Sequence, residues 1–392
     1  MKCFNKHQDL LNKALQISNM FKENAKDIDL NSAFPYENIL QLKHNKLMGL
    51  IAPLEYGGLE ADLLTVSKFV QILGSSCLST AMIFSMHCQQ IYTIANLKNN
   101  TVKSNILTNL CKKQIYIASV TSEYKKKSNL LKVDSSLNWL NTNEFLFNRR
   151  APIVTGGQHA DAYLITMRRN SSSLENDIAL VYTPKEDIHI EVNGKWESMG
   201  MRGTQSIPLT LSGTLTKDQI VNEEPFSVIA NKYMIPIGHI MWASCWLGAV
   251  KNIFQKTIKL IRKNSEKAKS ELTLHELAEA RLLIETVDTY LDTTILKYNE
   301  CICNNSDSNN QDWNLINIYI NNLKILASEN LIQALDILMN ICGVKYGYLL
   351  NEEIPLERTY RDLKSSSLMF NNDKLKEING KLSLFRSNLF DY

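Results

Sequence analysis

The spacing of apolar residues changes twice along the chain, and this change constrains the fold more than any other feature. Up to about residue 113, apolar residues recur at helical spacing, as at Leu63, Val66 and Phe69. Over residues 114–225 the apolar segments are short, β-branched or aromatic, and separated by turn residues, which is typical of antiparallel strands. After that the helical spacing returns. The sequence therefore predicts a mainly helical α+β protein with an N-terminal helical domain (1–113), a middle antiparallel β-domain (114–225) and a C-terminal helical bundle (226–392).

Composition agrees with a globular protein and excludes several other classes. The chain has 392 residues, of which 44% are hydrophobic and 21% charged, so it is long enough to bury a sizeable core. Its 43 Lys and Arg against 40 Asp and Glu leave a formal net charge of +3. This balance provides no global attraction to nucleic acid or to an anionic membrane, and we expect neither as a partner.

The cysteines and the N-terminal segment indicate the cellular compartment in which we expect the protein. The eight cysteines are scattered, with no C-x-x-C pair and no His at metal-ligand spacing, so we expect reduced thiols, no metal site and a cytoplasmic protein. The N-terminus has no continuous apolar stretch of the kind a secretory signal needs. Residues 233–250 contain no Asp, Glu, Lys or Arg, but they include Pro236 and His239 and run into an amphipathic segment. We interpret them as a buried helix rather than a membrane span.

Four segments, in order, resemble the acyl-CoA dehydrogenase family of flavoproteins. They are residues 48–74 (MGLIAPLEYGGLEADLLTVSKFVQILG) followed by 76–87, residues 117–123 (IASVTSE), residues 196–204 (WESMGMRGT) with the strand after them, and residues 354–362 (IPLERTYRD). The first resembles the family's Pro-x-Glu-Tyr-Gly-Gly turn, the third its Leu-Gly-x-Arg-Gly-Ser/Thr turn, and the last its Pro-x-Glu-Arg…Arg-Asp segment. One such match is generic, but four in order across nearly the whole chain are specific.

The resemblance implies a helical domain, a middle β-domain and a C-terminal four-helix bundle, with FAD between sheet and bundle in a homodimer or homotetramer. In that family a carboxylate removes the proton α to a thioester carbonyl while the β-hydrogen leaves as hydride to the flavin. The implied substrate is an acyl group carried by coenzyme A or by an acyl carrier protein.

The positions that resemblance assigns to the catalytic carboxylate carry no acid here. The usual position falls on Phe370, and the alternative, on the first helix of the bundle, falls on Gly238. Two nearby residues are our candidates for catalysis: His239, as a neutral base or a group that orients a carbonyl, and Asp373, as a relocated base. The alternatives are a hydrogen-bonded core histidine for His239 and a helix N-cap for Asp373.

The flavin contacts that the resemblance implies are partly kept. Thr121 and Ser122 are predicted to hydrogen-bond the isoalloxazine edge, although the glycines that follow in the family are absent here. In the family's Trp-Ile-Thr-Asn-Gly stretch this chain has residues 152–156, which places Val154 and Thr155 at the cofactor and moves the hydroxyl by one position.

Three further residues match the part of the family that holds a neighbouring subunit's FAD. Arg262 matches the Arg of an Arg-x-x-Phe-Gly turn, and Asn340 and Gly343 lie in the segment that corresponds to a Gln-x-x-Gly-Gly loop. The resemblance assigns them to the adenosine and pyrophosphate, for which an Arg supplies a strong electrostatic contact. For Arg262 a solvated helix end is the alternative.

Basic residues are the candidates for substrate binding. Lys125, Lys126 and Lys127 lie on a loop that would face the substrate entrance, and Arg202 is assigned to the same role. They would contact the phosphates of coenzyme A or an acidic helix of a carrier protein. A solvated loop is the alternative for the three lysines.

The leading functional prediction is an FAD-dependent oxidoreductase that acts on CH–CH groups of an acyl thioester or a related small molecule in specialised metabolism. Two alternatives stay open. A reduced-flavin-dependent oxygenase of the same fold abstracts no α-proton, so Phe370 would not impair it. A binding or assembly protein that has lost FAD is the third possibility, because the carboxylate and several flavin contacts are missing.

Overall fold

The first part of the chain is helical, as its apolar spacing predicts. The computed structural model of the protein describes residues 2–98, 100–124, 130–303 and 310–384. Its first helices are α1 (Lys2–Leu30), α2 (Tyr36–His44), α3 (Leu63–Gly74), α4 (Leu78–Ala95) and α5 (Asn100–Lys113). The Asp62 carboxylate accepts a hydrogen bond from the backbone N of Thr65 at 2.9 Å, which caps the start of α3. The apolar residues of these helices join one hydrophobic core with the rest of the chain.

The strands of the middle part form two sheets. They are β1 (Ile117–Val120), β2 (Asn138–Trp139), β3 (Glu144–Val154), β4 (Ala162–Arg168), β5 (Ile178–Pro184), β6 (His189–Val192) and β7 (Ile207–Thr216). Among the described residues one sheet has the order β1-β4-β5 and the other β2-β3-β7-β6. Exposed and buried residues alternate along β3 from Glu144 to Ala151, as they do in a strand with one face on a core.

One strand pair differs from the antiparallel prediction. β1 runs parallel to β4, with Ile117 opposite Ala162, whereas the other pairs are antiparallel. Parallel neighbours need a long connection. The chain provides it by passing through β2 and β3 of the second sheet before it returns as β4.

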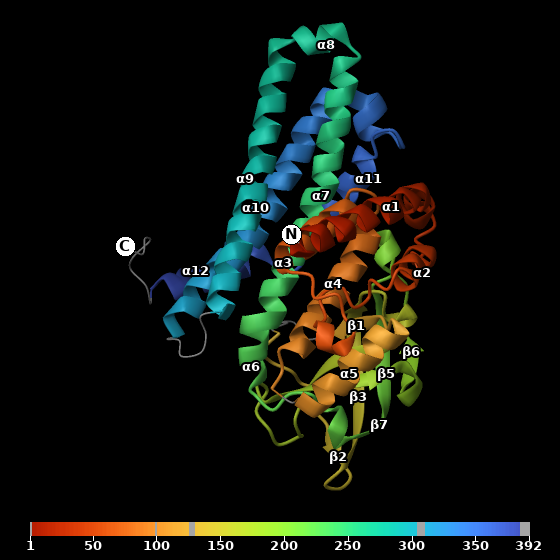
Figure 1. The fold of residues 1–392 in the computed structure, drawn as a ribbon, viewed down its shortest axis with the longest axis vertical. Coiled ribbons are helices and arrows are strands. Elements are labelled where there is room, and N and C mark those ends of the chain that lie inside the picture. Colours follow the sequence, from red (N-terminus) through yellow and green to blue (C-terminus); the bar gives the residue numbers. More distant parts are fainter. Residues whose placement is uncertain (1, 99, 125–129, 304–309, 385–392) are drawn as a thin grey trace.

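The last part is a helical bundle, which agrees with the predicted fold class. Its helices are α6 (Phe226–Ile229), α7 (Ile235–Arg262), α8 (Ser265–Lys269), α9 (Glu271–Cys303), α10 (Asn310–Gly343), α11 (Leu356–Leu363) and α12 (Asn372–Ser383). The long helices α7, α9 and α10 lie side by side, and the shorter α11 and α12 pack against α10 (Figure 1). The tip of the bundle at α8 lies at the opposite end of the molecule from β2.

Helix α7 is the central helix that residues 233–250 predict. By length and composition, the stretches Phe226–Arg262 and Trp313–Tyr348 would each suffice to cross a membrane, but 83% of the apolar window in the first is buried inside the fold. Helix α7 crosses α3 closely: a Cβ at Gly248 would lie 2.0 Å from the carbonyl O of Gln71. It therefore packs as a core helix between the N-terminal helices and the rest of the bundle.

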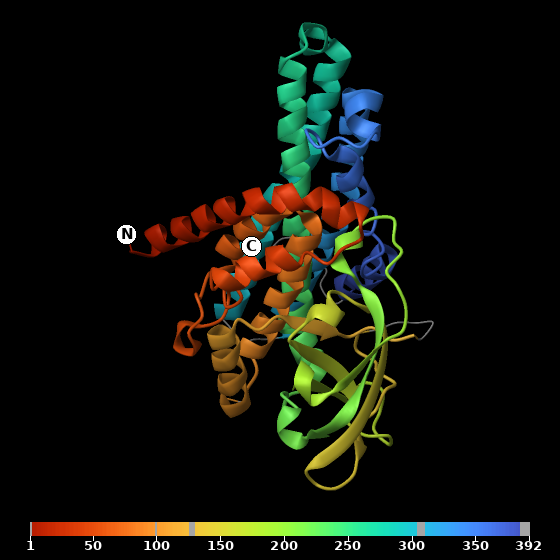
Figure 2. The same cartoon turned by 90° about the vertical axis from the view of Figure 1, so that its right-hand side faces the viewer.

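The three parts of the chain meet at a junction beside α11. Arg361 pairs with Asp29 of α1, with 2.5 Å between Nη2 and Oδ2, and its Nη1 donates to the carbonyl O of Met199 at 3.0 Å. The next residue, Asp362, accepts a hydrogen bond from the backbone N of Met201. A Cβ on Gly200 would lie 2.1 Å from the carbonyl O of Arg361, so only glycine allows this approach. Figure 2 shows α1 running across the molecule above the β-domain.

Candidate active site

His239 and Phe370 meet in the interior of the protein. His239 lies in the first turns of α7 and is 1% exposed. Its ring packs edge-on against the ring of Phe370, with centroids 5.3 Å apart, and against the ring of Trp242 at 5.4 Å. The position that corresponds to the family's catalytic carboxylate therefore presents an aromatic ring to a buried imidazole.

Lys324 of α10 completes this cluster, and our reading of the sequence missed it. Its side chain is fully buried, and Nζ donates to the carbonyl O of Phe370 at 3.0 Å and to Oδ1 of Asn372 at 2.7 Å. The signal that could have found it is a single lysine within an apolar helical run, with the buried Ile320 four residues before it and the buried Ala327 three residues after it. A charged residue at such a position needs buried partners.

The electrostatics of the cluster keep His239 neutral. Burial, reinforced by the nearby charge of Lys324, lowers the pKa of His239 to about 3, although the carbonyl of Ile320 opposes part of the shift. Neither ring nitrogen of His239 meets a well-oriented hydrogen-bond partner among the described residues, and the indole N–H groups of Trp242 and Trp246 also lack one. Burial likewise lowers the pKa of Lys324 to about 8. The ring nitrogens of His239 and the two indole N–H groups therefore retain hydrogen-bonding capacity, but the imidazole is a weak base.

The other two candidate positions have different surroundings. Asp373 is exposed in the first turn of α12, and the N-cap of that helix is Asn371, whose side chain accepts from the backbone N of Asp373 at 2.9 Å. Asp373 is therefore neither the predicted N-cap nor a buried neighbour of His239. At Gly238 a Cβ would lie 2.5 Å from Nε2 of Gln89, so the Gln89 side chain takes the space that a carboxylate there would need.

The residues predicted at the flavin edge do come together at the ends of β1 and β3. Ser122 donates from its Oγ to the carbonyl O of Ile153 at 2.8 Å, which holds the two strand ends side by side. The Thr121 hydroxyl has no partner among the described residues, and the Ile153 side chain is 50% exposed. A hydroxyl without a partner beside an exposed apolar side chain suits the rim of a flat, polar-edged ring.

The other two residues predicted to contact the flavin, Val154 and Thr155, already pack against or hydrogen-bond other parts of the protein. The Thr155 Oγ1 lies 3.0 Å from the Oγ of Ser206, and the Val154 side chain is fully buried. These two residues therefore present chiefly their backbone at the strand end. The fit to a flavin ring rests mainly on Thr121 and on the exposed strand ends.

A buried ion pair anchors the loop after β1, and this too was missed from the sequence. Arg149 of β3 is fully buried, pairs through Nη1 with Glu123 and donates from Nη2 to the carbonyl O of Ser122 at 3.1 Å. Burial lowers the pKa of Arg149 to about 10, while the charge of Glu123 opposes the shift. The sequence signal for this ion pair was an arginine at a buried position in the alternating exposed and buried residues of β3.

The residues assigned to a neighbour's cofactor gather at the other end of the bundle. Arg262 and Asn340 are exposed, and Gly343 has φ +67 with open space where a Cβ would be. Lys267 of α8 donates to the carbonyl of Ile341, which ties α8, the short helix after α7, to the end of α10. These ends lie far from the β-domain (Figure 1), so one chain cannot hold a single flavin with both sets of residues.

Of the four residues predicted to bind substrate, the structure describes one, Arg202. Lys125, Lys126 and Lys127 lie outside the described residues. Arg202 is half-buried, and its Nε donates to the Oγ of Ser32 at 2.9 Å, so the structure places it against the end of α1.

The arrangement as a whole is that of a flavin-dependent oxidoreductase with a β-domain between two helical regions. Two family models match the chain: the acyl-CoA dehydrogenase N-terminal domain over residues 7–114 and the acyl-CoA dehydrogenase C-terminal domain over residues 230–370. The chain belongs to the acyl-CoA dehydrogenase family. Membership supports a flavin oxidoreductase-like enzyme and a flavin as its class of cofactor.

Relatives in sequence and in structure differ in what they do. The chain is 23% identical over 375 residues to acryloyl-CoA reductase (NADH) of Anaerotignum propionicum, which covers 90% of this chain and 88% of that protein. Its fold resembles FMN-bound TdsC, a dibenzothiophene monooxygenase from Paenibacillus sp. A11-2, with a TM-score of 0.87, 16% identity and 98% of each chain covered. It also resembles methanesulfinate monooxygenase MsuC from Pseudomonas fluorescens, with a TM-score of 0.83, 15% identity and 97% and 98% covered.

Proposed function

We propose that this protein is a flavin-dependent oxygenase of the acyl-CoA dehydrogenase fold, which uses reduced flavin and oxygen on a small organic substrate. One observation carries the proposal: the ring of Phe370 packs on a buried His239 where the family has its carboxylate. Among the described residues no carboxylate makes an ion pair or hydrogen bond with that histidine.

The site favours oxygenation over dehydrogenation because the two reactions need bases of different strength. Thioester dehydrogenation requires removal of an α-proton, and an imidazole with a pKa of about 3 is poorly suited to hold it. Oxygenation has no such step, so a site with a neutral histidine and indole N–H groups is compatible with it. The likeness in fold to two monooxygenases is consistent with this reading.

The flavin would be held by residues at two places. Thr121 and the ends of β1 and β3 would contact the ring, and the neutral His239 would orient the substrate. When bound, the flavin supplies the two-electron redox chemistry and the reaction with oxygen. If the cofactor is FAD, Arg262 and Gly343 of a second copy would contact its pyrophosphate, which makes a homo-oligomer part of the proposal; FMN would not need them.

Oxidation of an acyl thioester is the second candidate. Acryloyl-CoA reductase and cyclohex-1-ene-1-carbonyl-CoA dehydrogenase, the latter from Syntrophus aciditrophicus (strain SB), are relatives at 23% and 21% identity, and both names denote coenzyme A thioester chemistry. For this chain that reaction would need a base other than a carboxylate at residue 370 or 238.

One experiment separates these readings. The purified protein is reconstituted with FAD or FMN and assayed in two ways: oxygen consumption with enzymatically reduced flavin and aromatic or sulfur-containing substrates, and reduction of an artificial electron acceptor with acyl-CoA thioesters. We expect substrate-dependent oxygen incorporation that His239→Gln abolishes and Asp373→Asn leaves unchanged, because Asp373 is exposed. Reduction of the acceptor by acyl-CoA would instead establish dehydrogenation. A colourless preparation that cannot be reconstituted would favour a binding protein.

A further inference from the structure

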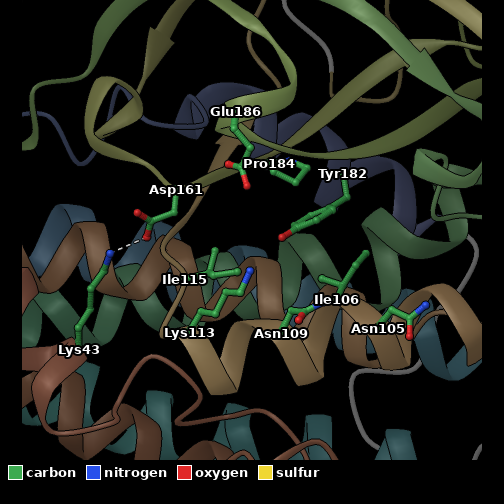
Figure 3. Close-up of a pocket in the computed structure, with 10 residues that line it drawn as sticks. All are labelled: Lys43, Asn105, Ile106, Asn109, Lys113, Ile115, Asp161, Tyr182, Pro184 and Glu186. Carbon is green, nitrogen blue, oxygen red and sulfur yellow. Dashed lines mark hydrogen bonds and ion pairs between the residues drawn. The ribbon is translucent and has the colours of Figure 1, made fainter.

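A cavity lies between the N-terminal helices and the β-domain. Its volume is about 330 Å³, within the lower range of small-molecule sites. It shares no lining residue with the His239 cluster or with the strand ends at Thr121 and Val154. Figure 3 shows the side chains that line it: Lys43, Asn105, Ile106, Asn109, Lys113, Ile115, Asp161, Tyr182, Pro184 and Glu186.

Two of its four charged groups already have partners. The Nζ of Lys43 lies 2.5 Å from Oδ2 of Asp161, and that carboxylate also accepts from the backbone N of Tyr116 at 2.7 Å. This ion pair joins α2 to the turn before β4. It forms one end of the cavity and needs no ligand for its charge balance.

The other two charges are unpaired and of opposite sign. Lys113, at the end of α5, and Glu186, after β5, are exposed at the mouth of the cavity and approach it from opposite walls (Figure 3). Neither makes an ion pair or a side-chain hydrogen bond with any residue that the structure describes. The lining is therefore neutral overall, yet it offers one free positive and one free negative group.

The floor of the cavity combines apolar surface with neutral polar groups. Tyr182 is 8% exposed, and its hydroxyl lacks a partner among the described residues. Burial and the nearby Glu186 and Asp161 raise the pKa of Tyr182 to about 12, so it remains a hydrogen-bond donor. Ile106 is buried beside it, and Ile115 and Pro184 add apolar contacts.

We propose that this cavity binds a small zwitterion with an apolar body, namely a free α-amino acid with a hydrophobic side chain. Its carboxylate would pair with Lys113, its ammonium group with Glu186, and its side chain would cover Ile106 and Ile115. A zwitterion makes a charge-assisted contact with both Lys113 and Glu186, whereas a ligand with a single charge makes only one of the two. This site does not depend on the flavin or on the proposed oxygenation.

The bound ligand would bridge two parts of the molecule. Lys113 belongs to the N-terminal helices and Glu186 to the β-domain, so occupation ties α5 to the end of β5. A ligand that binds only the folded state raises the unfolding temperature by mass action. Binding is therefore measurable without knowledge of the catalysed reaction.

The test uses the full chain with L-leucine and L-phenylalanine as probes, by calorimetry and thermal unfolding. N-acetyl-L-leucine lacks the ammonium charge and L-leucinamide lacks the carboxylate, so both compare directly with L-leucine on the unaltered protein. We expect the amino acids to bind and to raise the unfolding temperature, and each derivative to bind at least about tenfold more weakly, since each loses a charge-assisted contact.

Substitutions of the two unpaired charged residues test whether the amino acid binds in this cavity. Glu186→Gln and Lys113→Gln are each expected to weaken L-leucine binding by about tenfold or more. Lys112→Gln and Glu191→Gln, both exposed and outside the lining, are matched controls expected to bind as the unaltered protein does. The proposal fails if neither amino acid binds at millimolar concentration, if L-leucine and its N-acetyl derivative bind equally, or if both lining variants keep full affinity.

Discussion

At the scale of single residues, the cluster around His239 depends on an unusual backbone conformation. Phe370 has φ +52, a left-handed conformation that is uncommon for a bulky residue and unfavourable by roughly 1–2 kcal/mol. The hydrogen bond from the Lys324 ammonium to the carbonyl O of Phe370 helps to hold this turn. The ring is thereby directed onto the imidazole, and three residues distant in sequence form one site.

Replacing His239 by Leu should separate a functional role from a structural one. Both ring nitrogens are buried without a well-oriented partner, and such groups cost about 1–3 kcal/mol, so we expect His239→Leu to unfold at a higher temperature and to lose activity. The folded-state pKa of about 3 lies below the unfolded value, so the unaltered protein should lose stability relative to the variant as the pH falls below about 6.5.

His87 provides the matched control for this substitution. It is equally buried, but one ring nitrogen lies 2.9 Å from the carbonyl O of Met48, and the other accepts from the backbone N of Ile117 at 3.1 Å. We expect His87→Leu to destabilise the protein. Equal destabilisation by both substitutions would indicate that His239 is a structural histidine. Thermal unfolding measured across the pH range provides the comparison.

At the scale of elements, an ion pair anchors the end of β1, next to a loop whose sequence lacks the family's glycines. The family lets the backbone approach the cofactor through glycines, whereas here Glu123 turns inward and pairs with the fully buried Arg149. Asp134 and Ser135 donate their backbone N–H groups to the same carboxylate at 2.9 and 3.0 Å. The ion pair thus fixes the strand end that carries Thr121.

Removal of the arginine tests this anchor. Arg149→Met would leave Glu123 largely buried without its counter-charge, so we expect a loss of about 3–5 kcal/mol in unfolding free energy. We also expect weaker flavin binding, because the Thr121–Ser122 strand end would shift. Arg150→Met, on the exposed face of the same strand, is the control and should change both quantities little. Denaturant unfolding and flavin titration measure the two effects; equal values for both variants would exclude an anchoring role.

At the scale of the whole molecule, the junction at α11 joins all three parts of the chain. Arg361 pairs with Asp29, Gly200 packs directly on the backbone of α11, and Asp362 holds the turn before β7. Burial raises the pKa of Asp362 to about 7, and the hydrogen bond from Met201 and the charge of Arg361 offset only part of the effect. The fold therefore favours the protonated form of this carboxyl group.

The pH dependence of stability follows from that shift. Because the folded-state pKa lies above the unfolded value of about 3.9, the contribution of Asp362 is favourable at low pH and is lost as the pH rises toward about 7. Asp362→Asn keeps an acceptor for the Met201 N–H but cannot ionise. We expect the variant to match the unaltered protein near about pH 4 and to be more stable above about pH 7. Denaturant unfolding at several pH values measures this difference, and parallel profiles would contradict it.

Local patterns predicted most of the elements but not all of their pairings. The main strands are found where β-branched segments indicated them, because side-chain alternation is a property of neighbouring residues. The parallel pairing of β1 with β4 and the short strands β2 and β6 went unrecognised, since their partners are distant in sequence. The pairing of Arg149 with Glu123 and the burial of Lys324 went unrecognised for the same reason.

The amino-acid sequence by itself determined the order of helical and strand regions, the family, and the absence of a carboxylate at residues 370 and 238. These properties depend on the spacing and identity of nearby residues. Only the tertiary structure decided that Phe370 lies on His239, that Asp373 faces solvent, and that Lys113 and Glu186 face one cavity. Such contacts join residues of different elements, and their geometry arises when the elements pack and bury their charges together.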